Sequence, residues 1–189
     1  MNKNKIVMRP DVVPYLNTNT FDEPIWTRCG DGWTKFSENP NAQTEDTQYI
    51  NSASATTDTV SYKPQYSIEC DLMYTDPTIK KTYDIAKDRK TGSDAVLDFL
   101  IVDEFDTDKS GAMTARREQL AVAVTSIDGT NKMKMSGNLN GQGDGVKGKF
   151  VKADNPADGE SAGEFTPDSE SDKVEPASLT KKSEKSSLI

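Results

Sequence analysis

The chain has 189 residues, of which 33% are hydrophobic and 29% charged, and its formal net charge is −8. So little apolar content, spread over short runs, argues against a large globular core. The chain has no histidine, which excludes zinc sites and catalytic triads that need imidazole. The acidic balance argues against wrapping nucleic acid by neutralising its phosphates.

No apolar run approaches the length of a membrane helix. The basic N-terminal residues lack the apolar centre of a signal peptide, so we expect the protein to fold in the cytosol. Cys29 and Cys70 are then expected to be reduced, buried thiols, with a disulfide between them as the alternative.

The first segment, residues 1–24, contains three prolines and a polar patch of asparagine and threonine. This composition predicts an extended N-terminal arm with a short strand at residues 6–8. Residues 25–29 and 33–36 then flank a Gly-Asp-Gly sequence, which is typical of a tight β-hairpin. Each half of this hairpin carries one tryptophan. We expect both to pack in the core, and stacking on a ligand is the alternative.

Residues 37–61 form a long polar stretch that is broken only by Tyr49 and Ile50. A connection this long without its own periodicity is usually functional or disordered. We therefore predict a loop that orders by docking on a neighbouring subunit, with Tyr49 and Ile50 as its apolar contact. A mobile surface loop is the alternative.

Residues 66–74 alternate between apolar and polar side chains, the pattern of a half-buried strand. Asp76 and Pro77 then predict the start of a helix over residues 76–90, with its apolar stripe on Ile79, Tyr83 and Ala86. A glycine at position 92 is expected to take the left-handed conformation that follows a helix. Residues 95–102 are apolar on both faces except for one aspartate, which predicts a strand covered on both sides.

Asp106, Asp108 and Ser110 match the first half of a helix–loop–helix calcium loop. The match fails at its twelfth position, where Arg117 stands in place of the bidentate glutamate, and the flanks look extended. A hairpin turn is therefore favoured, and these three residues are only alternative candidates for a metal site.

Residues 119–127 and 132–139 flank an Asp-Gly sequence, which predicts a further hairpin. A second hairpin is expected to lead through the glycine-rich residues 140–145 into residues 146–150. The glycines are interpreted as a turn rather than a dinucleotide-binding loop because no helix follows them. Residues 153–189 are rich in Ser, Asp, Glu, Lys and Pro and predict an acidic C-terminal extension that cannot form its own core.

Together these elements predict a mainly β protein: a β-sandwich or partial barrel of antiparallel strands over residues 25–152, with one flanking α-helix, a long loop and extended termini. The order of the elements resembles that of the tail tube (major tail) proteins of long-tailed bacteriophages. The resemblance covers roughly residues 24–150 and is one of pattern, since the family offers no short diagnostic motif. It is carried by the tryptophan hairpin, the Asn39-Pro40 start of the long loop, its Tyr49-Ile50 pair, the Asp76-Pro77 helix and the C-terminal hairpins.

The resemblance implies hexameric rings that stack into a tube through which the genome passes. In that family the long loop is the usual contact between rings, which would make Asn39, Pro40, Tyr49 and Ile50 subunit-contact residues. The implied partners are further copies of the chain and other tail proteins, namely the tape measure, terminator and distal tail proteins. The implied location is the virion, after synthesis in the cytoplasm of a bacterial host.

Glu69 and Asp71 lie on the polar face of the strand predicted over residues 66–74. In a tube, carboxylates on that face could line the lumen and repel a passing phosphate backbone, although Lys132 and Lys134 would offset them. We expect no cofactor and no enzymatic activity, because the scattered carboxylates form no convergent acid–base set. The alternatives are a virion decoration or head–tail connector protein, or a small calcium- or ligand-binding β-domain.

Overall fold

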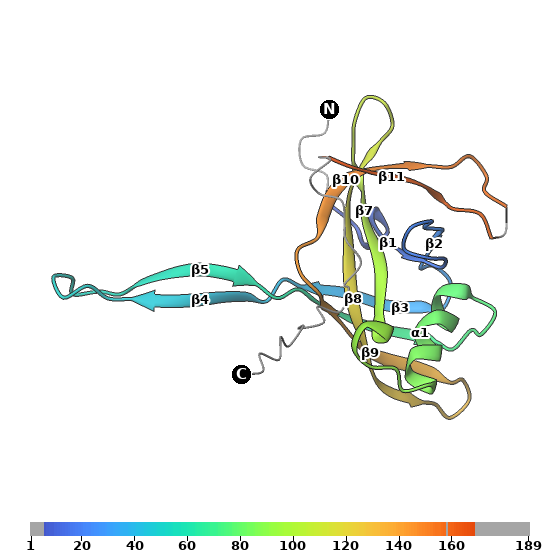
Figure 1. Cartoon of the computed structure of the whole chain (residues 1–189), viewed down its shortest axis with the longest axis horizontal. Helices are drawn as coiled ribbons and strands as arrows, with labels where there is room; N and C mark the ends of the chain where they lie inside the picture. The colour runs from blue at the N-terminus through green and yellow to red at the C-terminus, as the bar shows by residue number, and fades with distance from the viewer. Residues whose placement is uncertain (1–5, 158, 169–189) are drawn as a thin grey trace, which may run out of the picture.

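The computed structural model describes residues 6–157 and 159–168 and is mainly β, as the sequence predicts (Figure 1). Nine strands form one curled antiparallel sheet, whose main path runs β2-β1-β7-β8-β9-β6-β3. The strands of this sheet are β1 (Val12–Asn17), β2 (Trp26–Arg28), β3 (Trp33–Asn39), β6 (Gln65–Asp71), β7 (Val96–Thr107), β8 (Met113–Asp128), β9 (Lys134–Gly141), β10 (Val146–Lys152) and β11 (Gly163–Pro167). The other elements are the ribbon strands β4 (Ala42–Thr47) and β5 (Thr56–Tyr62), the helix α1 (Pro77–Lys87) and the 3-10 turns η1 (Arg9–Asp11) and η2 (Gly92–Ala95).

The long strands β7 and β8 organise the sheet, because each faces two separate cores. Leu97, Phe99 and Ile101 point from β7 into a first core, which they share with residues of β6, β8, β9 and α1. Leu100 and Val102 point the other way, into a second core built from β1, β2, β8 and β10. The prediction of a strand that is covered on both faces is confirmed.

β8 is long enough to carry two strands end to end along one edge. β9 pairs with its C-terminal half, from Leu120 onward, and β10 pairs with its N-terminal part, from Met113 to Arg117. The predicted hairpin between β9 and β10 is therefore wrong. Between them, residues 142–145 stay close to β8: the Gln142 N–H donates to the Gln119 carbonyl at 2.9 Å, and a Cβ on Gly145 would come within 2.9 Å of the Glu118 side chain.

The predicted N-terminal arm is a strand of the sheet over part of its length. β1 pairs with β7 on one side and with β2 on the other, and Val13, Tyr15 and Leu16 are buried. Pro14 fits in β1 although it has no N–H, because this position contributes only a carbonyl to the pairing. That carbonyl accepts the Cys29 N–H at 2.9 Å. Residues 6–8 do not form the short strand that we expected.

The predicted tryptophan hairpin is also wrong. The turn exists, since the Trp33 N–H donates to the Gly30 carbonyl at 3.1 Å, but β2 pairs with β1 and β3 pairs with β6. The two strands separate because their tryptophans enter different clusters. Trp26 packs in the second core, whereas Trp33 packs on the first core and on a third, small cluster of Cys70, Ile79 and Met135. Both tryptophans pack as core residues, as expected.

The second core is closed by a strand that the sequence analysis assigned to the C-terminal extension. β11 pairs with β10, and Phe165 packs on the core. The chain just before it reaches β2, where the Trp26 N–H donates to Ser161 Oγ at 3.2 Å and the Ala162 N–H donates to the Trp26 carbonyl at 2.8 Å. The extension predicted from residue 153 thus begins as part of the sheet; residues 158 and 169–189 lie outside the described part.

Helix α1 begins as predicted. Asp76 Oδ1 accepts the Thr78 and Ile79 N–H groups at 2.8 and 3.0 Å, and Pro77 occupies the first turn. The helix ends at Lys87, earlier than predicted. Gly92 takes the expected left-handed conformation, at φ 62°, but Arg89, which is nearer the end of the helix, does so as well, at φ 52°. Its buried residues also differ from the predicted stripe: they are Thr78, Ile79, Thr82 and Ile85.

Candidate subunit-contact surfaces

The predicted long loop is a two-stranded antiparallel ribbon that projects from the body (Figure 1). β4 and β5 pair from Ala42 opposite Tyr62 to Thr47 opposite Thr56, and every strand residue except Gln43 is exposed. A missed signal was the run of β-branched residues in β5, since threonine and valine favour strands. A ribbon of two strands without a core is marginally stable in water, so it gains most from a surface to dock on.

Two prolines mark the joint between ribbon and body. The β3–β6 ladder ends at Asn39 opposite Gln65, and two residues on each strand separate it from the first ribbon pair, Ala42 opposite Tyr62. Pro40 and Pro64 lie in this gap, one on each strand, and neither has an N–H to continue the ladder. The ribbon can therefore leave the plane of the β3–β6 pair.

The four residues predicted to contact another subunit are divided between the two ends of the ribbon. Asn39 and Pro40 lie at its base, whereas Tyr49 and Ile50 lie in the turn at its tip. At the tip, Tyr49 is 67% exposed and Ile50 is fully exposed. Two large apolar side chains exposed at the end of a polar ribbon make the tip a candidate contact site.

The ribbon is acidic along its middle. No lysine or arginine lies between Lys35 and Lys63, and the strands carry Glu45, Asp46 and Asp58. Glu45 stands directly opposite Asp58 in the ladder, an arrangement of like charges that destabilises a strand pair. Asp46 accepts the Thr57 hydroxyl, but within the described residues none of the three carboxylates forms a salt bridge.

A partly buried polar network holds the end of β3 from which the ribbon leaves. The Tyr66 hydroxyl donates to Glu118 Oε2 at 2.8 Å and accepts from Arg116 Nη2 at 2.8 Å. Arg116 Nη2 also donates to Glu38 Oε1 at 2.8 Å. Burial, with Glu118 as a second cause, raises the pKa of the Tyr66 phenol, so the hydroxyl stays protonated and keeps donating.

The predicted lumen residues lie on the outer face of β6, opposite its buried side. Glu69 forms an ion pair with Lys134 at 3.3 Å, and Asp71 forms one with Lys132 at 3.2 Å. The neighbouring rungs of the ladder carry the hydrogen-bonded amide and hydroxyl pairs Gln65–Asn140 and Ser67–Asn138. This face is therefore polar and close to charge-balanced, and repulsion argued from the two carboxylates alone is offset by the lysines.

The residues that matched half a calcium loop form the turn of the β7–β8 hairpin, as the favoured interpretation predicts. Asp108 Oδ1 accepts from the Ser110 N–H, the Ser110 hydroxyl and the Ala112 N–H, and these hydrogen bonds to Ser110 and Ala112 lower its pKa. Asp106 instead accepts the Thr114 hydroxyl at 2.6 Å. Among the described residues, no group of three or more His, Cys, Asp or Glu side chains is placed to hold a metal ion.

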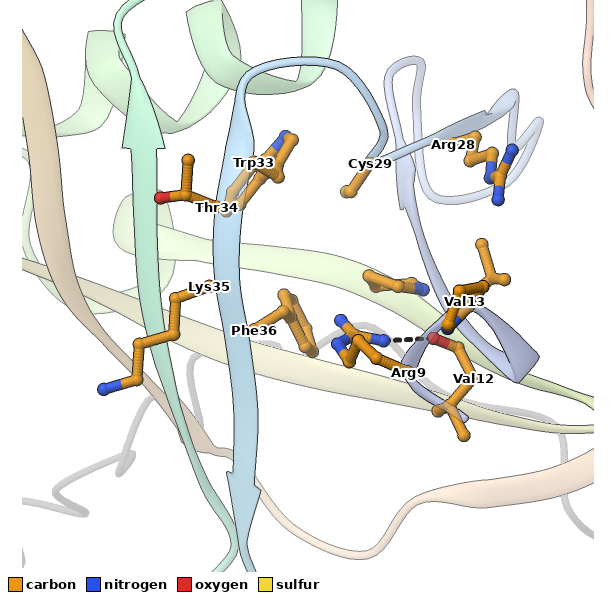
Figure 2. A pocket seen from close by; sticks show the side chains of 11 residues that line it. Arg9, Val12, Val13, Arg28, Cys29, Trp33, Thr34, Lys35 and Phe36 are labelled. Carbon is orange, nitrogen blue, oxygen red and sulfur yellow. Dashed lines mark hydrogen bonds between the residues drawn. The ribbon is translucent and has the colours of Figure 1, made fainter. Parts of the chain in front are cut away.

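The curled sheet leaves a seam between its β1–β2 and β3 sides, and a pocket of about 200 Å³ opens there (Figure 2). We call it the seam pocket; it is lined by Arg9, Pro10, Val12, Val13, Pro14, Arg28, Cys29, Trp33, Thr34, Lys35 and Phe36. The Cys29 thiol is free and buried, and burial raises its pKa, so it remains protonated. Cys70 is free and buried as well. No sequence pattern indicated this pocket, because its residues come from separate strands.

None of the helices that the structure describes has the length and apolar character needed to cross a bilayer.

Comparison with known proteins finds similar folds but no similar sequences. No family model and no curated protein matches the chain. Among solved structures, it resembles a chain in the tail of an empty GTA particle refined with helical and C6 symmetry, with 14% identity, a TM-score of 0.52, and coverage of 74% of this chain and 97% of that one. A chain in the 6-fold symmetrised baseplate of the anti-feeding prophage (AFP) matches with 10% identity and a TM-score of 0.46, covering 78% of this chain and 97% of that one. The tail-tube-like fold predicted from the sequence is confirmed at the level of the fold.

Proposed function

We propose that this protein is a structural subunit that assembles with copies of itself into hexameric rings, and that the rings stack into the tube of a phage tail or tail-derived device. Such a tube would conduct the genome. The fold shared with a chain of a C6-symmetric tail supports this proposal. The sequence supplies no competing catalytic set, so the protein would act through its surfaces rather than through chemistry.

The observation that carries the proposal is the projecting ribbon β4–β5. It has no core of its own and exposes Tyr49 and Ile50 at its tip. Docking on another copy would bury these side chains and stabilise the ribbon. In a monomer the two side chains stay in contact with water. The sheet also ends in β3, whose outer edge has no neighbouring strand in the described part, and a partner could cover it.

The polar face of β6 and β9 is our candidate for the wall of the lumen, with Glu69 and Asp71 among its residues. Its carboxylates are paired with lysines, which leaves little net field along the face. A charge-balanced, hydrophilic wall would neither bind DNA through phosphate neutralisation nor strongly repel it. DNA could then pass along the lumen without binding to its wall.

A tube of this kind needs proteins that set its length and proteins that close its two ends. The partners would therefore include the tape measure, terminator and distal tail proteins. The protein would be made in the cytoplasm of the bacterial host and would function in the virion. A decoration or head–tail connector role differs in one measurable way, because such a protein binds preformed particles and does not polymerise alone.

Electron microscopy of the purified protein over a range of concentrations tests the proposal directly. The matched variant replaces residues 44–60 with Asn-Gly, which joins the register partners Gln43 and Ser61 through a two-residue turn. We expect wild-type protein to form tubes, and the shortened variant to keep its thermal transition but form no tubes. Tubes of normal length from the variant would refute the role of the ribbon. A wild-type protein that is monomeric at every concentration would refute the proposed function.

A further inference from the structure

We propose that the seam pocket of one copy is the receptor for the ribbon tip of another copy, with Tyr49 and Ile50 entering the pocket and the ribbon carboxylates facing Arg9 and Arg28. This inference rests on the proposed self-assembly and names the surface that receives the ribbon. It rests on three features of the pocket: its shape, its charge and the strand edge beside it.

The walls of the pocket are apolar and its size suits side chains. Trp33 and Phe36 lie on the β3 side, and Val12, Val13 and Cys29 lie on the β1–β2 side (Figure 2). A volume of about 200 Å³ is below the roughly 300–1,000 Å³ of small-molecule sites. The pocket is therefore better suited to one or two apolar side chains than to a ligand, and the ribbon tip presents two.

The rim of the pocket carries positive charge that complements the ribbon. Arg28 is exposed, and its side chain forms no hydrogen bond or ion pair with the described residues, while the Arg9 guanidinium donates to the Val12 carbonyl. No acidic residue lines the pocket. On the ribbon, Asp46 lies three residues before Tyr49, which at about 3.3 Å per residue is roughly 10 Å, so a docked tip brings the carboxylates to the rim.

One strand edge beside the pocket is free and the other is occupied. On the β1 side, the Val12 carbonyl is bonded by Arg9, and Pro14 has no N–H and its carbonyl is bonded by Cys29. β3 is the last strand in its sheet, so its outer edge has no strand neighbour in the described residues. An incoming ribbon can therefore add backbone hydrogen bonds to β3.

Other surfaces fit an acidic, apolar tip less well. The pocket between α1 and the β1–β2 connection is lined by three aspartates and only two lysines, Lys81 and Lys90, so it offers the acidic ribbon no excess of positive charge. The exposed Met73, Tyr74 and Met133 near the β8–β9 turn are apolar, but the nearby cations Lys132 and Lys80 are already paired with Asp71 and Asp84. Charge complementarity thus favours the seam pocket.

Photo-crosslinking in assembled tubes tests the location of the tip. A benzophenone amino acid replaces Ile50 in the full-length chain, and cross-linked peptides are identified by mass spectrometry after irradiation. We expect links between copies to residues 9–14 and 28–36. Tubes whose cross-links map instead to residues 73–74 and 133, or to residues 1–5, would overturn the receptor assignment and leave the tube function standing. Wild-type protein without tubes would overturn both.

Charge reversal tests the same contact in unlabelled protein. Arg28→Glu should raise the critical concentration for tube formation at least about tenfold, and adding Asp46→Arg in the same chain should restore it. Lys109→Glu, on the exposed β7–β8 turn, makes the same change in net charge and should have less than about a twofold effect. Equal effects of Arg28→Glu and Lys109→Glu, or no rescue by the second substitution, would overturn the assignment. Thermal unfolding confirms that each variant is folded.

Discussion

The guanidinium of Arg117 binds the carboxylate of Asp98 through two nitrogens, with Nε 3.0 and 3.1 Å from the two oxygens and Nη2 2.6 Å from Oδ2. Both side chains are nearly buried, at 13% and 8% exposure. The same guanidinium lies over the rings of Phe21 and Trp26 and donates to the Phe21 carbonyl. One ion pair therefore ties β7 and β8 to the connection between β1 and β2.

Loss of this pair should be costly, because a buried charge without its partner is strongly destabilising. We expect Asp98→Asn to lower the free energy of unfolding by about 3 kcal/mol, measured by urea titration. The matched control is Asp84→Asn, which breaks the more exposed Lys80–Asp84 pair on α1 and should cost less than about 1 kcal/mol. Equal losses in the two variants would show that the Arg117–Asp98 pair contributes no more to stability than the exposed Lys80–Asp84 pair.

The proline joint leads to a prediction about assembly rather than stability. Replacing Pro40 and Pro64 with alanine restores an N–H on each strand, so the β3–β6 ladder can run on into the ribbon and change its direction. The free energy of unfolding should shift by no more than about 1 kcal/mol, because both positions lie outside the cores. Tube formation should be impaired, as measured by sedimentation. Thr44→Ala, within the ribbon strand, serves as the control and should assemble normally.

The parts of the fold that the sequence predicted correctly are those with strong local signals. The alternation through Tyr66, Ile68 and Cys70 identified β6, and Asp76 with Pro77 identified the start of α1. The Asp128-Gly129 turn likewise identified the β8–β9 hairpin. In each case the local pattern and the final packing agree, so propensity alone was sufficient.

Strand partners could not be predicted in the same way, because distant burial decides them. The turn at Gly30 and Gly32 reads as a hairpin, but Trp26 is drawn into the second core and takes β2 away from β3. β11 was missed for a related reason. Phe165 is a single apolar residue in a polar segment, and its burial depends on a core formed by residues far earlier in the chain.

The candidate contact surface was predicted in part. Tyr49 and Ile50 stand out in a polar segment, so the apolar tip could be found from the sequence. The ribbon itself has no buried face and therefore no apolar periodicity to detect. The seam pocket brings Arg9, Arg28 and Phe36 together only because the sheet curls, and no local sequence pattern predicts that these residues lie close together.

Alkaline pH should weaken the fold through Tyr15. Burial raises the pKa of its phenol to about 12, with nearby Glu104 as a smaller cause, from about 10 in the unfolded chain. Below pH 10 both states hold the proton. Between pH 10 and 12 only the unfolded state releases it, so stability should fall by about 2 to 3 kcal/mol across this window.

Tyr15→Phe isolates this contribution, because the variant keeps the ring contact with Phe150 and removes the ionising group. Urea unfolding at pH 9 and pH 12 should show a smaller loss in the variant than in the wild type. Some loss should persist in both, since burial also raises the pKa of Cys70 to about 11. Tyr62→Phe, on the exposed ribbon, is the control and should behave as wild type. Identical profiles for Tyr15→Phe and wild type would rule out Tyr15 as the cause.

Two truncations separate the sheet-forming part of the C-terminal segment from the rest. A chain ending at Asp168 keeps β11 and should unfold with the same free energy as the full-length protein. A chain ending at Lys152 loses β11, the Phe165 packing and both hydrogen bonds to Trp26, and leaves one side of the second core open. It should lose about 2 kcal/mol or more, the scale of exposing one large apolar side chain.

Thermal and urea unfolding of the two truncated chains, compared with the full-length protein, check this directly. Equal stability of the shorter chain and the full-length protein would mean that β11 does not close the second core. Electron microscopy of the same two proteins adds a separate readout. If the chain ending at Asp168 still forms tubes, residues beyond it are not needed for the subunit contact. If only the chain ending at Lys152 fails, the failure follows from the opened core, because both chains contain every residue of the ribbon and of the seam pocket.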